Sequence, residues 1–452
     1  MSSPYRTLFV GTLVQESFLS VGGVDDPNTT VDSPFCRNGQ DRPTLRGTGL
    51  AGALIATLHR HLGSSPVPKT ISGSKDGRQP SVWRFFNSHP LESPKPAYRQ
   101  HVAIDARTGA AATGALFNVE TLPPGTRWPF LLEVDTDRDA SAAEHARDAL
   151  CHWAAGRCLL GREVARGLGW MRLEDLHEYP LTDAQSDAWP CAKAADDYPG
   201  YIKKSFSSLA MPVPATRDAL NGWLEITGSV SAGIHHEGYG LDSLSIGGHA
   251  SEELAAAWDD RFLAPDGMSN PQAAFDPDFA IVTFAQKYGE QSVRRLPYIP
   301  GSSLRGPLRH ALARLRRARG EADLAVVKSL FGTPVENSTK LLKSAKLLIC
   351  DALPDDRQDA PPLQLAWMQH HAEDEFAGGA YGSAKFDRVT VMQGRFLWKM
   401  IVEDADEVEQ TALRELFDLA QARQIGIGGG QWRGHGWLHW QINDFTLPEE
   451  ST

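Results

Sequence analysis

The sequence predicts an α+β protein made of two tandem copies of one module. Residues 160–170 read LGREVARGLGW and residues 427–437 read IGGGQWRGHGW, with five identities in eleven positions at a constant offset of 267. Earlier segments repeat in the same order, which is typical of a duplicated unit. The chain has 452 residues, of which 41% are hydrophobic and 22% charged, so two or three domains with cores of their own are expected.

The repeat also predicts where the domains begin and end. The offset in residue number between the copies is 217 at the first strand, where 8–11 match 225–228. It is 254 at the first helix, where 46–50 match 300–304, and 269 or 270 where 101–125 match 371–394. The rise from 217 to 254 places 37 additional residues in the second copy, before its first helix. We predict domains at 1–190 and 220–447, a linker at 191–219 and the insertion at about 235–290. An extended strap packed on both domains is the alternative to a linker.

Each copy follows the order strand, helix, strands, helix, strand. Apolar and β-branched runs predict the strands, and leucines at helical spacing predict the first helix of copy two, at Leu304, Leu308, Leu312 and Leu315. Small residues precede these helices, so Thr48 in copy one and Ser302 or Ser303 in copy two are expected caps. The order fits a ferredoxin-like plan, with helices on one face of an antiparallel sheet. The predicted strands are 5–18, 131–134, 170–173, 222–231, 396–402 and 437–442, and later helices lie near 140–157 and 406–423.

Composition excludes several classes of protein. An odd number of cysteines, five, without a CxxC pair argues against a disulfide framework or a cysteine zinc site. A net charge of −11 excludes a uniformly basic surface, although local basic patches stay possible. We expect no membrane contact and a cytoplasmic location, because no apolar run reaches about 20 residues and the start lacks a secretory signal.

Four segments are candidate phosphate-binding sites: two helix starts and two Gly-rich loops that each carry an arginine. Helix N-termini present unpaired N–H groups and a partial positive charge. The ordinary alternatives are turns for the loops and a solvated face for the arginine-rich helix at 305–319. The residues predicted to bind an RNA backbone are Arg46, Gly47, Thr48, Arg166, Gly301, Ser302, Ser303, Arg305, Arg309 and Arg433.

Two further features suggest chemistry on RNA. The segment from 101 to 125 resembles an extended β-hairpin, and Leu116 with Phe117 is either an apolar wedge beside bases or simply core. Asp32 lies in a polar loop, where it is either a turn former or a group that positions a metal or a ribose 2′-OH. Neither GxxxxGK[ST], G-x-S-x-G nor HExxH is present, so P-loop, serine-hydrolase and zinc-protease chemistry have no support.

These residues together resemble a known family. VDSPFCR at 31–37, with PTLRGTGL at 43–50, resembles the head of a RAMP-superfamily protein, and PYIPGSSLRG at 297–306 resembles that head's strongest motif. The chain is similar to the backbone subunits of type III CRISPR effector complexes. Two such subunits in one chain resemble the fused type III-D systems.

The resemblance implies a modified RNA-recognition fold, with a palm that holds guide RNA and a hairpin thumb that kinks the guide–target duplex. It implies that Asp32 supports target-RNA cleavage with Mg²⁺ or Mn²⁺, with Asp32 as the metal ligand. Copy two departs from the pattern, and Asp242 is the substitute expected there. The implied partners are guide RNA, target RNA and further effector subunits of the same superfamily. The implied thumb residues are Leu116, Phe117, Lys385 and Phe386.

Three hypotheses follow from the sequence. The leading one is a guide-bound, metal-dependent endoribonuclease subunit in which Asp32 is catalytic. The second is a non-catalytic scaffold that spaces RNA and docks neighbouring subunits. The third, a standalone guide-processing nuclease, calls for a catalytic histidine, and the candidates are His101, His235 and His236.

Overall fold

The chain forms two compact units of mixed α/β structure. The computed structural model describes residues 5–23, 31–74, 78–104, 111–186, 189, 197–233, 242–248, 262–263, 277–288, 292–333, 344–373, 376 and 379–444. Contacts group Met1–Val164 with Leu168–Trp223 as unit 1, and Ala165–Gly167 with Leu224–Thr452 as unit 2. Three residues of the first Gly-rich loop therefore belong to unit 2.

Unit 1 is built on one antiparallel sheet with the strand order β2-β5-β1-β7-β6, and β8 pairs with β7. A separate hairpin of β3 and β4 leaves the chain between β2 and β5. Its elements are β1 (Arg6–Gln15), α1 (Gly47–Leu62), α2 (Lys69–Ser72), β2 (Trp83–Phe85), β3 (Ala97–Ile104), β4 (Ala111–Thr121), β5 (Arg127–Asp135), α3 (Ala142–Ala154), β6 (Cys158–Leu159), β7 (Trp170–Leu181), α4 (Asp183–Ser186), α5 (Tyr198–Ser205) and β8 (Met211–Pro212).

Both faces of the unit 1 sheet are covered. In β1, Phe9 and Leu13 join the core under α1 and α3, whereas Leu8 and Val10 face the cluster formed with α5. This alternation follows from the two-residue period of a strand. Part of the segment predicted as a linker thus forms α5 and β8 on unit 1, while residues 191–196 lie outside the described part.

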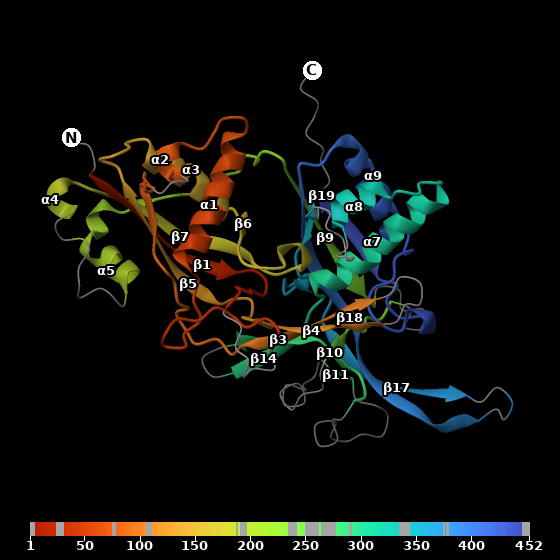
Figure 1. Ribbon diagram of the computed structural model, residues 1–452. Coiled ribbons are helices and arrows are strands. Elements are labelled where there is room, and N and C mark those ends of the chain that lie inside the picture. The colour runs from red at the N-terminus through yellow and green to blue at the C-terminus, as the bar shows by residue number, and fades with distance from the viewer. Residues whose placement is uncertain are drawn as a thin grey trace. The chain divides into compact units, whose positions relative to one another are not determined.

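Unit 2 repeats the arrangement. Its sheet contains the order β15-β18-β9-β19, which corresponds element by element to β2-β5-β1-β7, and β17 pairs with the first half of the long strand β18 in a hairpin (Figure 1). Its elements are β9 (Trp223–Ala232), β10 (Gly247–Gly248), β11 (Phe262–Leu263), β12 (Ala280–Ile281), β13 (Thr283–Tyr288), β14 (Ser292–Pro297), α7 (Gly301–Ala318), α8 (Ala325–Phe331), β15 (Leu347–Ile349), β16 (Leu353–Pro354), β17 (Gln364–Glu373), β18 (Ala380–Glu403), α9 (Glu407–Gln421) and β19 (His439–Asp444).

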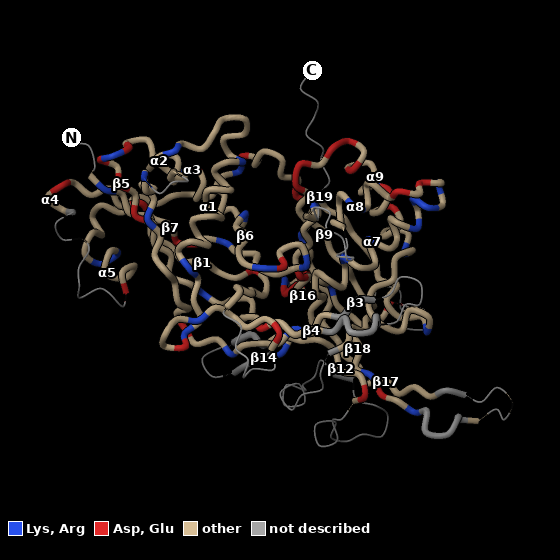
Figure 2. The backbone as a smooth tube through the Cα atoms, viewed as in Figure 1, with Lys and Arg blue, Asp and Glu red and all other residues tan. Residues whose placement is uncertain are grey.

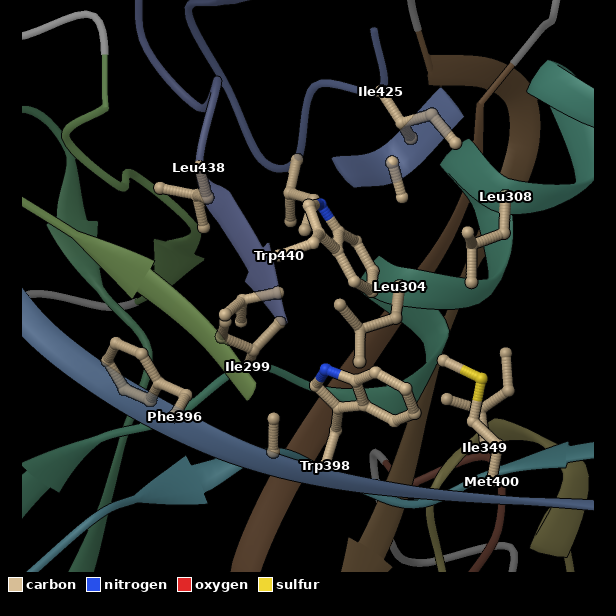
Figure 3. Close-up of a cluster of buried hydrophobic side chains, with 14 of the residues drawn as sticks. Ile299, Leu304, Leu308, Ile349, Phe396, Trp398, Met400, Ile425, Leu438 and Trp440 are labelled. Carbon is tan, nitrogen blue, oxygen red and sulfur yellow. The ribbon is translucent and has the colours of Figure 1, made fainter. Parts of the chain in front are cut away.

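The core of unit 2 confirms the leucine pattern of its first helix. Leu304, Leu308 and Leu312 of α7 are fully buried. Figure 3 shows Leu304 near the indole rings of Trp398 on β18 and Trp440 on β19, which meet edge to face with ring centroids 5.9 Å apart. Burial of apolar side chains at about 25 cal/mol per Å² makes such a cluster a principal source of stability.

Candidate nucleic-acid interface

Asp32 lies beside β4 of the unit 1 hairpin. The segment beside it adds to β4 in parallel, because Ser33 N–H donates to the carbonyl of Asn118 (3.1 Å) and Glu120 N–H donates to the carbonyl of Ser33 (3.0 Å). Asn118 N–H donates to Oδ2 of Asp32 at 2.8 Å. This hydrogen bond fixes the carboxylate on the backbone of β4. The Asp32 side chain is exposed, so the carboxylate is also open to solvent.

Unit 2 contains the same pattern at Asp278. Phe279 N–H donates to the carbonyl of Asp387 (3.0 Å), and Val389 N–H donates to the carbonyl of Phe279 (2.9 Å). Asp387 N–H donates to Oδ2 of Asp278 at 2.7 Å. Asp278 is exposed, as Asp32 is. Three hydrogen bonds of one unit therefore recur, donor for donor, in the other.

Asp242 occupies a different position. Gly436 N–H donates to the carbonyl of Ser243 (2.8 Å), just as Gly169 N–H donates to the carbonyl of Phe18 (2.7 Å) in unit 1. Asp242 therefore matches the residue before Phe18, close to the first strand of the sheet. Its side chain is only 5% exposed. Asp242, predicted to be catalytic, therefore shares neither the backbone position nor the exposure of Asp32.

A histidine–phenylalanine stack accompanies each aspartate. His101 stacks on Phe117 with ring centroids 5.0 Å apart and planes 12° apart. His370 stacks on Phe386 at 5.1 Å and 16°. Each phenylalanine directly precedes the residue whose amide holds the aspartate. The predicted thumb residues Phe117 and Phe386 thus lie within the paired strands of the two hairpins, each opposite its stacked histidine.

The other predicted thumb residues are less informative. Lys385 is exposed on β18. Leu116 belongs to β4, but its side chain lies outside the described part of the chain. His235 and His236 are likewise outside it. Among the histidine candidates, His101 is described, and its Nε2 lies 3.2 Å from a carboxylate oxygen of Glu163.

The Gly-rich loop of unit 2 forms a stacked column of side chains. The guanidinium of Arg433 lies 4.3 Å from the ring centre of Phe386 and 4.1 Å from that of Trp432. Trp432 is 80% exposed. The structure thus joins two residues predicted from separate segments, Phe386 and Arg433. Sequence analysis missed Trp432, although an aromatic residue next to the loop arginine was visible there.

Two histidines near this column are held neutral. Burial lowers the pKa of His370, and the nearby Arg388 and Arg433 lower it further. Burial, again with Arg388 contributing, lowers the pKa of His435 to about 4. The Nδ1 atom of His435 lies 2.6 Å from Oγ of Ser243, which fixes the ring. The positive charge of this region therefore resides on its arginines.

The helix starts differ from the prediction. Neither α1 nor α7 has a side-chain cap from its own first turn, so the expected caps Thr48, Ser302 and Ser303 are wrong. The amide of Gly47 donates to Oδ1 of Asn87 (2.9 Å), and that of Gly301 donates to Oδ1 of Asp351 (2.8 Å). These amides are satisfied by residues that follow the next strand in each unit.

A carboxylate at the start of α7 changes its electrostatics. Asp351 is buried and offsets the positive end of the helix dipole, so this N-terminus is a poorer phosphate site than the sequence suggested. In unit 1 the neutral Asn87 leaves the dipole of α1 uncompensated at this point, and Arg46 and Thr48 are exposed beside it.

Arg305 has a structural task. Its guanidinium donates to the carbonyl oxygens of Ala165 (3.3 Å), Leu347 (3.0 Å) and Phe331. Burial lowers its pKa to about 10, and Arg309 adds to that effect. Burial also lowers the pKa of Arg309 itself. Arg166 and Arg433 are exposed on the short turns η1 (Val164–Arg166) and η5 (Gln431–Arg433), so we place them before Arg305 as candidates for RNA contact.

Charges and metal ligands are dispersed. Figure 2 shows basic and acidic residues interspersed along the backbone of both units. Within the described ranges, no three histidine, cysteine or acidic side chains gather in a way that would hold a metal ion. A single carboxylate such as Asp32 fits a Mg²⁺ ion that keeps most of its water and takes phosphate oxygens from a substrate, which is the usual habit of this ion.

Comparison with known proteins identifies the family. The model of the RAMP superfamily matches residues 16–172 and 289–439. The chain belongs to the RAMP superfamily. The two matched ranges make it a RAMP protein with two tandem repeats, and the membership suggests an RNA-binding, CRISPR-associated subunit. Asp32 lies inside the first matched range of this RAMP protein, whereas Asp242 and Asp278 lie outside the second.

Two further comparisons are brief. No curated protein matches the chain. Among the helices that the structure describes, none has the length and apolar character needed to cross a bilayer.

Proposed function

We propose that this protein is a subunit of a type III CRISPR effector complex, in which it binds guide RNA and cleaves complementary target RNA. The observation that carries the proposal is Asp32, an exposed carboxylate fixed by the Asn118 amide of the β3–β4 hairpin in a RAMP repeat. A stacked pair, His101 and Phe117, lies next to that amide. The partners proposed with it are guide RNA, target RNA and further subunits of the same superfamily.

The strand order supports a ferredoxin-like fold for each repeat. The connection β1, α1, β2, β5, α3, β7 with the sheet order β2-β5-β1-β7 is that of a βαββαβ unit with its two helices on one face. The β3–β4 and β17–β18 hairpins each leave the chain before the third strand of that unit. We assign these hairpins as the thumbs and the sheets with their helices as the palms.

The proposed reaction is transfer of a phosphoryl group within the target strand. A ribose 2′-oxygen attacks the adjacent phosphorus, the bond to the 5′-oxygen breaks, and the products carry a 2′,3′-cyclic phosphate and a 5′-hydroxyl. A bound Mg²⁺ or Mn²⁺ would stabilise the developing negative charge on the phosphate. Asp32 would hold that ion together with phosphate oxygens. The hydrogen bond from Asn118 keeps the carboxylate in one orientation for this task.

A non-catalytic scaffold is the second candidate. It is favoured by the finding that, among the described residues, Asp32 belongs to no group of three or more histidine, cysteine or acidic side chains that could hold a metal ion. Such a subunit would still grip RNA through exposed arginines such as Arg166 and Arg433. The two candidates share RNA binding and differ only in cleavage.

The test uses the assembled complex with guide RNA. Asp32→Asn keeps an oxygen that accepts the Asn118 amide but removes the charge, and Asp32→Ala removes both. We expect each to abolish one set of cuts, with a loss of at least about 100-fold, because several kcal/mol of transition-state stabilisation disappear. Co-purified guide RNA should be unchanged. A wild-type complex that binds target in Mg²⁺ without cutting it would support the scaffold instead.

A further inference from the structure

We infer that Asp278 is the catalytic carboxylate of a second cleavage site, so that the chain cuts target RNA at two places. This inference rests on the proposed function of Asp32. It assigns to unit 2 an active residue that the sequence repeat placed elsewhere, at Asp242.

The backbone around Asp278 has the same hydrogen bonds as the backbone around Asp32. Ser33 and Phe279 make the same two hydrogen bonds to β4 and β18, and the preceding residue in each case is an aspartate. The amides that hold the two carboxylates belong to Asn118 and Asp387, which lie 269 residues apart, as the hairpin repeat requires. The carboxylates of Asp32 and Asp278 therefore occupy equivalent positions in the backbone of the two repeats.

The surroundings of the two carboxylates also correspond. Both aspartates are exposed, and within the described residues the second oxygen of each carboxylate has no hydrogen-bond partner. Each lies beside a stacked histidine and phenylalanine. In unit 2 the guanidinium of Arg388 lies 5.2 Å from the ring centre of Phe279, directly after Asp278. A cation next to the residue that follows Asp278 suits the binding of a polyanion.

Asp242 lacks these properties. It is buried and comes just before Ser243, whose carbonyl accepts from Gly436 and whose hydroxyl contacts His435. These contacts with the Gly-rich loop are made by Ser243 and not by the Asp242 carboxylate. Asp242 is therefore the matched control for a charge change in unit 2.

The chemistry at Asp278 is that proposed for Asp32. The 2′-oxygen forms a bond to phosphorus, the bond from phosphorus to the 5′-oxygen breaks, and water supplies the leaving oxygen with a proton while solvent takes the proton of the 2′-hydroxyl. No oxidant or further reactant is needed. The new 5′-hydroxyl and 2′,3′-cyclic ends identify each cut.

The decisive experiment maps target-fragment ends for complexes that carry Asp278→Asn, Asp278→Ala, Asp242→Asn or Asp32→Asn. We expect both Asp278 variants to lose one set of cuts by at least about 100-fold, and Asp32→Asn to lose a different set. Asp242→Asn should keep both sets. Guide RNA content and thermal unfolding report whether each variant has folded.

A second measurement does not depend on cleavage. With a target that carries 2′-deoxyribose at the cut positions, Mn²⁺ binding can be followed by electron paramagnetic resonance. Asp278→Asn should lower the number of bound ions by one relative to the parent complex.

The outcomes separate the two ideas. If Asp32→Asn loses cuts while a folded Asp278→Asn keeps every cut and every Mn²⁺ ion, the inference is wrong and the proposed function stands. If neither variant alters cleavage, the proposed function fails as well. Loss of cuts in a folded Asp242→Asn, with Asp278→Asn active, would return the second site to Asp242.

Discussion

The Gly-rich loop of unit 2 depends on a glycine that no other residue can replace. Gly436 has φ +84°, and a Cβ atom placed there would lie 2.1 Å from the carbonyl oxygen of Ile427. That carbon would collide with backbone, which cannot rotate away. Gly320 has the same φ of +84° but nothing within 4 Å of its Cβ position, so it provides a control with equal torsional strain.

The two substitutions therefore separate strain from collision. Gly320→Ala should cost about 1 kcal/mol of unfolding free energy, which is the usual penalty for a left-handed alanine. Gly436→Ala adds the collision and the loss of the hydrogen bond from Ile427 N–H to the Gly436 carbonyl (2.9 Å), so we expect a loss of about 3 kcal/mol or more.

Urea unfolding, followed by tryptophan fluorescence to which the buried Trp398 and Trp440 of unit 2 contribute, measures both losses. The displaced loop should also weaken RNA binding in Gly436→Ala, because Arg433 and Trp432 are carried by it. Equal losses of stability in the Gly436 and Gly320 variants would refute the close-approach argument.

Two other predictions concern the same loop. In the folded chain the pKa of His435 falls to about 4, below its ordinary value of 6.5, so the unfolded chain binds the proton more tightly. The stability that neutral His435 contributes to the fold is therefore fully present above pH 6.5. It is lost as the pH falls toward 4, by up to about 3 kcal/mol. His435→Gln should flatten the pH dependence of unfolding in that window, and an unchanged slope would contradict it. Arg433→Ala should weaken guide-RNA binding by about 10-fold at low salt and reduce the slope of log affinity against log salt by about one. Arg414→Ala, which removes an exposed arginine of α9, is the control. Equal effects of the two substitutions would count against a specific contact of Arg433 with RNA.

Much of the fold could be predicted from local patterns. The leucine spacing of α7, the strands at both ends of each repeat and the paired Gly-rich loops depend on residues close together in sequence. The helix caps could not be predicted in this way. Asn87 and Asp351 come from about 40 and 50 residues beyond the amides that they satisfy, and only the folded chain brings them there.

Asp278 escaped prediction because the insertion is divided. The offset between the repeats is 217 from β1 to β9, rises to 225 where Phe18 matches Ser243, and reaches 246 where Ser33 matches Phe279. It becomes 254 at Pro43 and Pro297, because a short turn in unit 1 is extended to the β13–β14 hairpin in unit 2. A single block of 37 residues was therefore the wrong description of the insertion.

The two repeats also carry opposite charges beside the stacked histidine and phenylalanine. Glu163 of unit 1 has a left-handed φ of 56° and faces His101, whereas its counterpart, Gly430, has φ 73° and no side chain. A Cβ atom on Gly430 would lie 2.7 Å from Nη1 of Arg388, so the guanidinium occupies the space that a carboxylate would need.

This exchange has a consequence for RNA binding. Unit 1 places a negative charge beside its His–Phe stack, and unit 2 places Arg388 and Arg433 there. The electrostatic attraction of an RNA backbone is therefore stronger at the unit 2 stack, and it is screened as salt increases. If both sites cleave, raising the salt concentration should slow the cuts that depend on Asp278 more than those that depend on Asp32. Equal slowing of the two sets would show that the difference between Glu163 and Gly430 does not reach the bound RNA.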